Sequence, residues 1–443
     1  MKLWLALALV LPAAVVSGQG RRGRGGPPPV YRTETPAHAV DIVVGKPTAS
    51  GVVLSVRSDT DRKGHIAYGL APERLDKRTP DKTFAKDTVE FVPIEGYAAG
   101  TTVHWRWVAD GVETPVRSFT TLRKPGGVFT FSIQADSHLD MGSDAKVYLR
   151  SLAEAAKTDF LVDLGDTFMV DKYKTYTDSH PQYLAQRWYW GEFGKPVLAV
   201  NGNHDGEQGR YRNASADNMA DWSRKERTTH FPSQDKHYWA VDAGDALLIG
   251  LDPYWYTTNR PARGNDSDDN WPVTLGKEQY DWLRKTLEGS KARWKFVFLH
   301  NLVGGRGRDN RGGAEVAHLW EWGGKGPDGA DLFAEKRPGW EMPIHDLLRK
   351  HRVAAVFHGH DHLYVRQEKD GIVYQTVPQP SHGGGGASRS ADEYGYTSGT
   401  ILHGSGILTV TVSPKTADVV FLRTDRSDAG VETHRYTLGE AAK

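Results

Sequence analysis

The chain has 443 residues, of which 38% are hydrophobic and 25% charged, and 56 basic against 55 acidic side chains give a formal net charge of +1. This composition excludes a disordered chain, and the balanced charge, with no recognition motif, argues against a nucleic-acid-binding protein. Because cysteine is absent, disulfides, thiolate catalysis and cysteine-ligated zinc are excluded. The length predicts two domains or one large one.

The first 18 residues have the pattern of a secretory signal peptide. Lys2 precedes an apolar run over 3–16, which small residues follow up to Gly18. A buried helix or an uncleaved anchor is the alternative, although the run is shorter than the roughly 20 residues of a membrane span. We therefore expect a secreted or periplasmic protein that has no transmembrane segment once the signal is removed. Residues 19–35, rich in Gly, Pro and Arg, are predicted to be a flexible linker.

Residues 36–122 have the pattern of a small β-sandwich. Short alternating runs such as 52–57 and 103–108 are typical of strands, and Asp110-Gly111 between two such runs predicts a hairpin. About 85 residues of this kind favour an all-β module. Its segments resemble a fibronectin type III domain, which carries no chemistry of its own.

From residue 126 to about 440, strands alternate with helices. Near-continuous apolar runs at 128–135, 160–164, 197–200, 295–299 and 353–357 predict strands of a sheet that is covered on both faces. Helical spacing occurs at 145–156 and 277–287, and Asp370-Gly371 predicts another hairpin. The expected fold class is therefore α/β, preceded by the smaller β-sandwich.

Each of these five strands ends in polar residues that bind metals in other proteins. Side chains at the carboxyl ends of strands gather at one edge of an α/β sheet, so they are expected to form one site. Their donors are oxygen and nitrogen only, which suits divalent Mn, Fe or Zn. Two adjacent cations need a bridging carboxylate, for which Asp166 is the natural candidate, and such a pair suits phosphoryl transfer. The candidate residues are Asp136, His138, Asp166, Asn203, His204, Asp205, His300, His360 and His362.

Taken in order, these motifs resemble the calcineurin-like metallophosphoesterase superfamily. The motifs are D-x-H at 136–138, G-D at 165–166, G-N-H-D at 202–205, a histidine at 300 and G-H-D-H at 359–362. The resemblance implies a β-sandwich core flanked by helices. With its preceding β-module, the layout is similar to that of purple acid phosphatases.

The resemblance also implies a role for each residue. One metal ion would be bound by Asp136, His138, Asp166 and His362, and a second by Asp166, Asn203, His300 and His360. His204 would protonate the leaving group or stabilise the phosphoryl oxygens, and Asp205 would orient His204. Water activated between the two metals would attack the phosphorus atom.

Two positions depart from the purple acid phosphatase pattern. His138 stands where that branch has glycine, and Met169 stands where it has a metal-binding tyrosine. Without the tyrosine a purple Fe(III) centre is not expected. The glycine-rich segment that follows His300 contains three candidate substrate contacts, Arg306, Arg308 and Arg311. One guanidinium group can donate two parallel hydrogen bonds to two oxygens of a phosphate.

The sequence therefore predicts an exported phosphoesterase with two divalent metal ions and a small-molecule phosphate ester as substrate. A phosphomonoesterase is the first expectation. A phosphodiesterase, of the cyclic nucleotide, nucleotide or glycerophosphodiester type, is the close alternative. A non-catalytic binding protein is the third, and the complete motif set argues against it.

Overall fold

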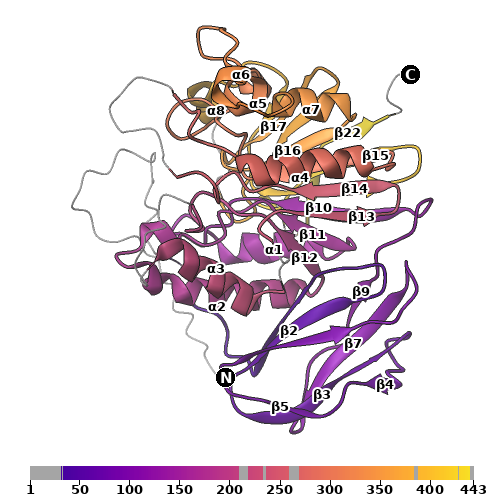
Figure 1. The fold of residues 1–443 in the computed structure, drawn as a ribbon. Helices are drawn as coiled ribbons and strands as arrows, with labels where there is room; N and C mark the ends of the chain where they lie inside the picture. Colours follow the sequence, from indigo (N-terminus) through magenta and orange to yellow (C-terminus); the bar gives the residue numbers. More distant parts are fainter. Residues whose placement is uncertain are drawn as a thin grey trace, which may run out of the picture.

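The computed structural model describes residues 31, 33–208, 218–232, 236–258, 269–383, 388–427 and 429–439 (Figure 1). The predicted signal peptide and most of the predicted linker lie outside the described residues. Across the described segments, none of the helices combines the length and the apolar character needed to cross a membrane.

Three sheets organise the described residues. The largest, with nine strands, has the order β22 (Val431–Leu438), β21 (Ala417–Arg423), β20 (Gly406–Val412), β10 (Phe129–Gln134), β11 (Phe160–Asp163), β12 (Pro196–Ala199), β1 (Val40–Gly45), β2 (Val52–Ser58) and β6 (Val89–Ile94). The second has seven, in the order β13 (Trp239–Ala243), β14 (Ala246–Gly250), β15 (Trp294–Leu299), β16 (Ala355–His358), β18 (Ile372–Thr376), β17 (Tyr364–Lys369) and β19 (Thr400–Leu402). The third contains β4 (Lys77–Arg78), β3 (Arg62–Gly69), β7 (Thr102–Ala109) and β8 (Val112–Glu113), with β5 (Lys82–Phe84) on β3 and β9 (Arg117–Thr120) on β7.

The two larger sheets pack face to face around an aromatic core. Alternate residues of each strand point inward, so Phe131 of β10 contacts Phe160 of β11 and Phe298 of β15, with ring centroids 5.5 and 5.9 Å apart. This packing gives the β-sandwich core that the family resemblance implies.

Helices cover the outer faces of both sheets. In chain order they are α1 (Ala145–Ala155), α2 (His180–Phe193), α3 (Met219–His230), α4 (Gly276–Gly289), α5 (Trp320–Gly323), α6 (Phe333–Lys336), α7 (Ile344–Lys350) and α8 (Ser388–Tyr394), with the short 3-10 turns η1 (Val170–Lys172), η2 (Tyr176–Ser179) and η4 (Ala314–Val316). α1 and α2 cover the nine-stranded sheet, where Leu152 and Tyr189 join Leu161 in one cluster. α4 and α7 cover the seven-stranded sheet, and α5 to α8 lie at the end of the molecule opposite the N-terminal module (Figure 1).

The N-terminal module is itself a β-sandwich. Its two layers enclose Trp105, Trp107 and Leu54, all 0% exposed. One layer, β1-β2-β6, continues into the core sheet because β1 pairs in parallel with β12, Val44 opposite Pro196. The module is therefore joined to the core by backbone hydrogen bonds as well as by the chain between them.

The local predictions for strands and turns are confirmed. The apolar runs form β10, β11, β12, β15 and β16, and the two helical stretches form α1 and α4. Asp110-Gly111 and Asp370-Gly371 each close a two-residue hairpin, and all four residues have positive φ, as a type I′ turn requires.

Candidate metal centre

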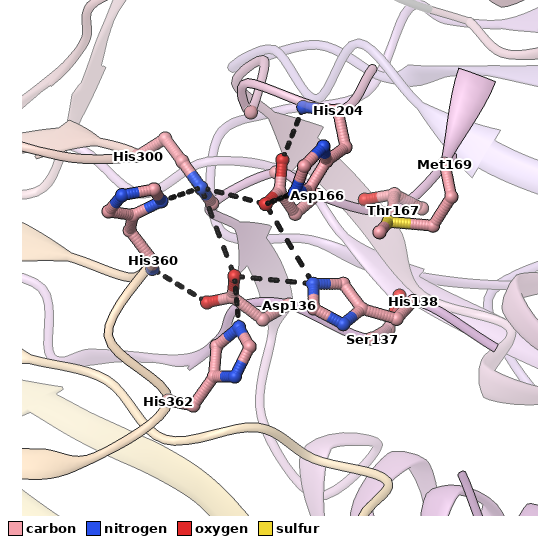
Figure 2. Close-up of polar contacts among 12 residues, drawn as sticks. Asp136, Ser137, His138, Asp166, Thr167, Met169, His204, His300, His360 and His362 are labelled. Atoms are coloured by element: carbon pink, nitrogen blue, oxygen red, sulfur yellow. Dashed lines mark hydrogen bonds and ion pairs between the residues drawn. The ribbon is translucent and has the colours of Figure 1, made fainter. Parts of the chain in front are cut away.

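The predicted side chains come together at one edge of the two packed sheets. Figure 2 shows imidazoles from both sheets arranged around the carboxylates of Asp136 and Asp166. Asp136 and His138 follow β10, Asp166 follows β11, and residues 203–205 follow β12, whereas His300 follows β15 and the pair His360 and His362 follows β16. The ligand side chains are thus supplied across the sandwich, from strands of two different sheets.

The turns that carry these side chains are unusually tight. Asp136, Asp166 and His360 have φ of 59°, 53° and 72°, in the left-handed region that non-glycine residues seldom adopt. Gly202 allows its turn to approach the site, since a Cβ there would lie 2.1 Å from Asp166 Oδ1. A Cβ on Gly359 would lie 2.7 Å from Asp136 Oδ2.

Two groups of three possible metal ligands form within this edge. The ligand atoms of Asp136, His138 and His362 all lie within 4.8 Å of one another, and so do those of Asp166, His300 and His360. The groups adjoin, because His138 Nε2 is 3.5 Å from Asp136 Oδ1 and 3.8 Å from Asp166 Oδ2. Asn203 is buried in the turn beside His204, whose backbone N–H donates to Asp166 Oδ1 at 2.8 Å.

Both carboxylates are held in their charged form. Burial alone would raise the pKa of Asp136, but the imidazoles of His362 and His300 outweigh burial and keep this pKa well below its usual range. Burial acts in the same way on Asp166, whose pKa is likewise held low by His300 and His204. Ionised carboxylates are what cation binding requires.

The imidazole rings of the site are oriented by partners of the ring nitrogens that face away from the carboxylates. His300 Nδ1 donates to the carbonyl of Leu164 at 2.8 Å, which turns Nε2 toward Asp166, 3.1 Å away. His138 Nδ1 is 3.3 Å from Gln379 Nε2 and 3.8 Å from an oxygen of Asp140. Such partners set the tautomer and the direction of a ligating imidazole.

His204 is oriented by a different carboxylate from the one expected. Its Nδ1 is 2.8 Å from Asp171 Oδ1, and its Nε2 faces Asp166 Oδ2 at 3.9 Å. Asp205 instead accepts the backbone N–H groups of residues 166, 167, 168 and 202, so it holds the turns together. The expectation that Asp205 orients His204 is therefore wrong. Burial and the charge of Asp166 raise the pKa of Asp205 to about 7.

The three candidate arginines differ in what they contact. Arg311 donates to Asp361 at 3.0 Å and to the backbone carbonyl of His360, and it stacks on Tyr394. Its guanidinium is thus engaged in holding the G-H-D-H turn, which argues against a substrate contact. Arg306 is exposed and Arg308 is half-buried, and a substrate contact by either stays a prediction.

Sequence reasoning missed several polar residues around the site. Asp171, Asp140 and Gln379 orient imidazoles, yet each lies outside the strand-end motifs that gave the ligand set. Two further groups each bring three possible ligands within 4.8 Å. These groups are His138, Asp140 and His382 beside the site, and His180, Glu226 and His230 between α2 and α3.

Fold and site together define a metal-dependent phosphoester hydrolase. The family model for calcineurin-like phosphoesterases matches residues 130–364, more than half of the chain, and the protein belongs to that family. No curated protein matches the chain in sequence.

Two solved structures share this fold. The structure of PhoD superimposes with a TM-score of 0.67 at 15% identity and covers 90% of each chain. The purple acid phosphatase PPD1 from seeds of yellow lupin (Lupinus luteus) gives a TM-score of 0.59 at 12% identity, over 90% of this chain and 74% of that chain.

Proposed function

We propose that this protein is an exported phosphomonoesterase with a pair of divalent metal ions. The observation that carries the proposal is the meeting of two ligand groups at Asp136 and Asp166, with His204 beside them. The name of one structural neighbour, a purple acid phosphatase, supports the preference for phosphomonoesters.

The residues present fit two divalent cations. Asp136 Oδ1 and His138 Nε2 are buried, face each other at 3.5 Å and have no hydrogen-bond partner among the described residues, which is costly unless a ligand satisfies them. The donor set of oxygen and nitrogen suits Mn, Fe or Zn. One ion would be held by Asp136, His138, Asp166 and His362, and the other by Asp166, Asn203, His300 and His360.

The chemistry that two such ions supply is polarisation of phosphoryl oxygens and activation of water near neutral pH. His204 supplies the proton. Its Nδ1–H donates to Asp171, which leaves Nε2 directed at the site, and the doubly protonated ring gives the Nε2 proton to the leaving alcohol oxygen as the P–O bond breaks.

Turnover of the mono- and bis-esters of p-nitrophenol, measured with added Mn, Zn or Fe and after chelation, tests the proposal. Activity should require the metal and favour the monoester. A large preference for the diester would overturn the substrate assignment, and metal-independent activity would overturn the mechanism. Export is tested by N-terminal sequencing of the periplasmic or secreted protein, which should begin after Gly18.

Two substitutions test the assigned roles. Asp166→Asn should lower turnover by orders of magnitude and reduce bound metal. His204→Ala should lower turnover of an alkyl phosphate by about 10²–10⁴-fold while the metal stays bound, and turnover of p-nitrophenyl phosphate far less. Asp242→Asn, an exposed carboxylate on β13, is the matched control and should change neither quantity. Full activity in both site variants would show that these residues have other roles.

A further inference from the structure

Tyr31 lies in the segment predicted to be a flexible linker, yet it is only 7% exposed. Its backbone forms an antiparallel bridge with Asp140, and its ring stacks on Tyr173 with centroids 4.8 Å apart and planes 24° apart. The N-terminal segment thus contacts the loops around the metal centre, although Tyr31 lies more than 100 residues before Asp140 in the sequence.

The Asp140 contact leads to one of the ligand imidazoles. Asp140 is two residues beyond His138, and its Oδ2 lies 3.8 Å from His138 Nδ1, on the side of the ring opposite the two metal-binding carboxylates. Asp140 Oδ1 is itself held by the Gly142 N–H at 2.8 Å and by His382 Nε2 at 3.1 Å.

The Tyr173 contact leads to the proposed proton donor. Tyr173 directly follows η1, which carries Asp171, and Asp171 holds His204 Nδ1 at 2.8 Å. Tyr31 therefore connects two loops, and each loop carries the carboxylate that orients an imidazole of the site.

The electrostatic surroundings of Tyr31 agree with this placement. Burial has the largest effect on the pKa of its hydroxyl and raises it. The neighbouring Tyr173 and the negative charges of Asp171, Asp140 and Asp166 raise this pKa further. The phenol thus stays neutral in an acidic neighbourhood, and the ring packs without adding a charge to the site.

We infer that Tyr31 is a positioning residue, a clamp from the N-terminal segment that holds the Asp171 loop against the Asp140 loop and so fixes the direction of His204. The inference rests on the proposed function, in which His204 protonates the leaving group. Proton donation depends steeply on geometry, because a displacement of about 1 Å costs on the order of 100-fold in rate.

The test compares leaving groups. An alkyl phosphate needs its leaving oxygen protonated, whereas p-nitrophenyl phosphate releases a stable anion and needs this far less. At saturating metal, Tyr31→Ala should lower kcat/KM for the alkyl ester by about 10–100-fold and for p-nitrophenyl phosphate by less than about threefold. Tyr31→Phe keeps the stack and the backbone bridge, so it should stay within about twofold of the parent for both esters.

Controls separate the clamp from a general loss of stability. Tyr97→Ala removes an aromatic pair with Tyr68 in the N-terminal sandwich, far from the site, and should leave the ratio of the two rates unchanged. Asp171→Asn should show the same leaving-group selectivity as Tyr31→Ala. Because both act through His204, the double variant should be no more than about twofold slower than Asp171→Asn.

The clamp would be overturned if Tyr31→Ala lowered kcat/KM equally for both esters. It would also be overturned if the losses in kcat/KM of the two single variants multiplied in the double variant. A Tyr31→Phe variant as selective as Tyr31→Ala would also overturn it, since the effect would then belong to the hydroxyl. If His204→Ala and Asp171→Asn show no selectivity either, the role proposed for His204 fails as well. If those two are selective and Tyr31→Ala is not, the clamp alone is wrong.

Discussion

At the scale of single residues, the site is built on strained backbone. His138 and His362 have φ of 52° and 59°, like the other ligand residues of these turns. Such conformations cost about 1–3 kcal/mol each and persist only where the surroundings enforce them. Here the enforcement is visible, because the Asp136 N–H donates to the Gly165 carbonyl and the His138 N–H to the Asp166 carbonyl, at 2.9 and 3.2 Å. The two turns thereby hold each other in place.

Gly202 gives a prediction at this scale. Gly202→Ala would place a methyl group 2.1 Å from Asp166 Oδ1 and 2.2 Å from the Asp166 backbone nitrogen, so the Asp166 carboxylate has to move. We expect metal-dependent activity to fall by at least about 100-fold, since a shift of about 1 Å has that effect. Activity and bound metal are measured together. Gly289→Ala, where the new Cβ meets nothing within 4 Å, is the control, and equal activity in the two variants would contradict the close approach.

At the scale of elements, α2 is tied to the N-terminal sandwich by one fully buried side chain. Arg187 of α2 donates to the side chain and backbone of Asp41 on β1, to Ser55 on β2 and to the carbonyl of His230 at the end of α3. Burial alone would raise the pKa of Asp41, but the charge of Arg187, together with His38 and Arg57, outweighs burial and keeps that pKa below its usual range. Arg187 thus connects two helices to β1 and β2 of the nine-stranded sheet.

Removing this charge should destabilise the protein strongly. Arg187→Met leaves Asp41 buried beside only the more distant His38 and Arg57, each 3.6 Å away, and loss of one partner of a buried pair costs about 3–5 kcal/mol. Urea denaturation measures the free energy of unfolding. The double variant Asp41→Asn/Arg187→Met should recover part of the loss. Arg284→Met, which breaks a surface pair with Glu288, should change the free energy far less than Arg187→Met, and a similar loss in both arginine variants would contradict the argument.

At the scale of the whole molecule, polar contacts across the sandwich join the two sheets next to the site. Asn201, two residues after the end of β12, donates to Asp252 beyond β14 at 2.9 Å and to Glu207 at 2.7 Å. Burial and the charge of Glu207 raise the pKa of Asp252 to about 7. The sandwich therefore encloses a carboxyl group that titrates near neutral pH.

Asp252 makes stability depend on pH. Its pKa is about 7 when folded and about 3.9 when unfolded, so between these values the folded state binds more protons and loses stability as pH rises, by up to about 1.4 kcal/mol per pH unit. Asp252→Asn removes this contribution. The parent should therefore lose stability relative to the variant as the pH rises from 4.5 to 7.5. Denaturation at several pH values measures it, and parallel curves for the two proteins would contradict the raised pKa.

Much of the fold, and the gathering of the candidate ligands at one edge of the sheets, could be predicted because the signals are local. Apolar runs and the Asp110-Gly111 turn depend on neighbouring residues, and each ligand motif directly follows its strand. The partner of His204 could not be predicted in this way. Asp205 is next to it in sequence, but Asp171 is the carboxylate that reaches its ring, and 33 residues separate them. Tyr31 likewise had no local signal that it is buried.

The sequence by itself determined which strands and turns form, the residue types that gather at their ends and, through them, the family. Only the tertiary structure decided which of these strands lie in each of the two facing sheets, that the N-terminal module shares one of those sheets, and that Asp171 and Tyr31 reach the site. The physical reason is that periodicity and turn chemistry act between near neighbours, whereas the orientation of an imidazole depends on whichever distant side chain the packed sheets place beside it.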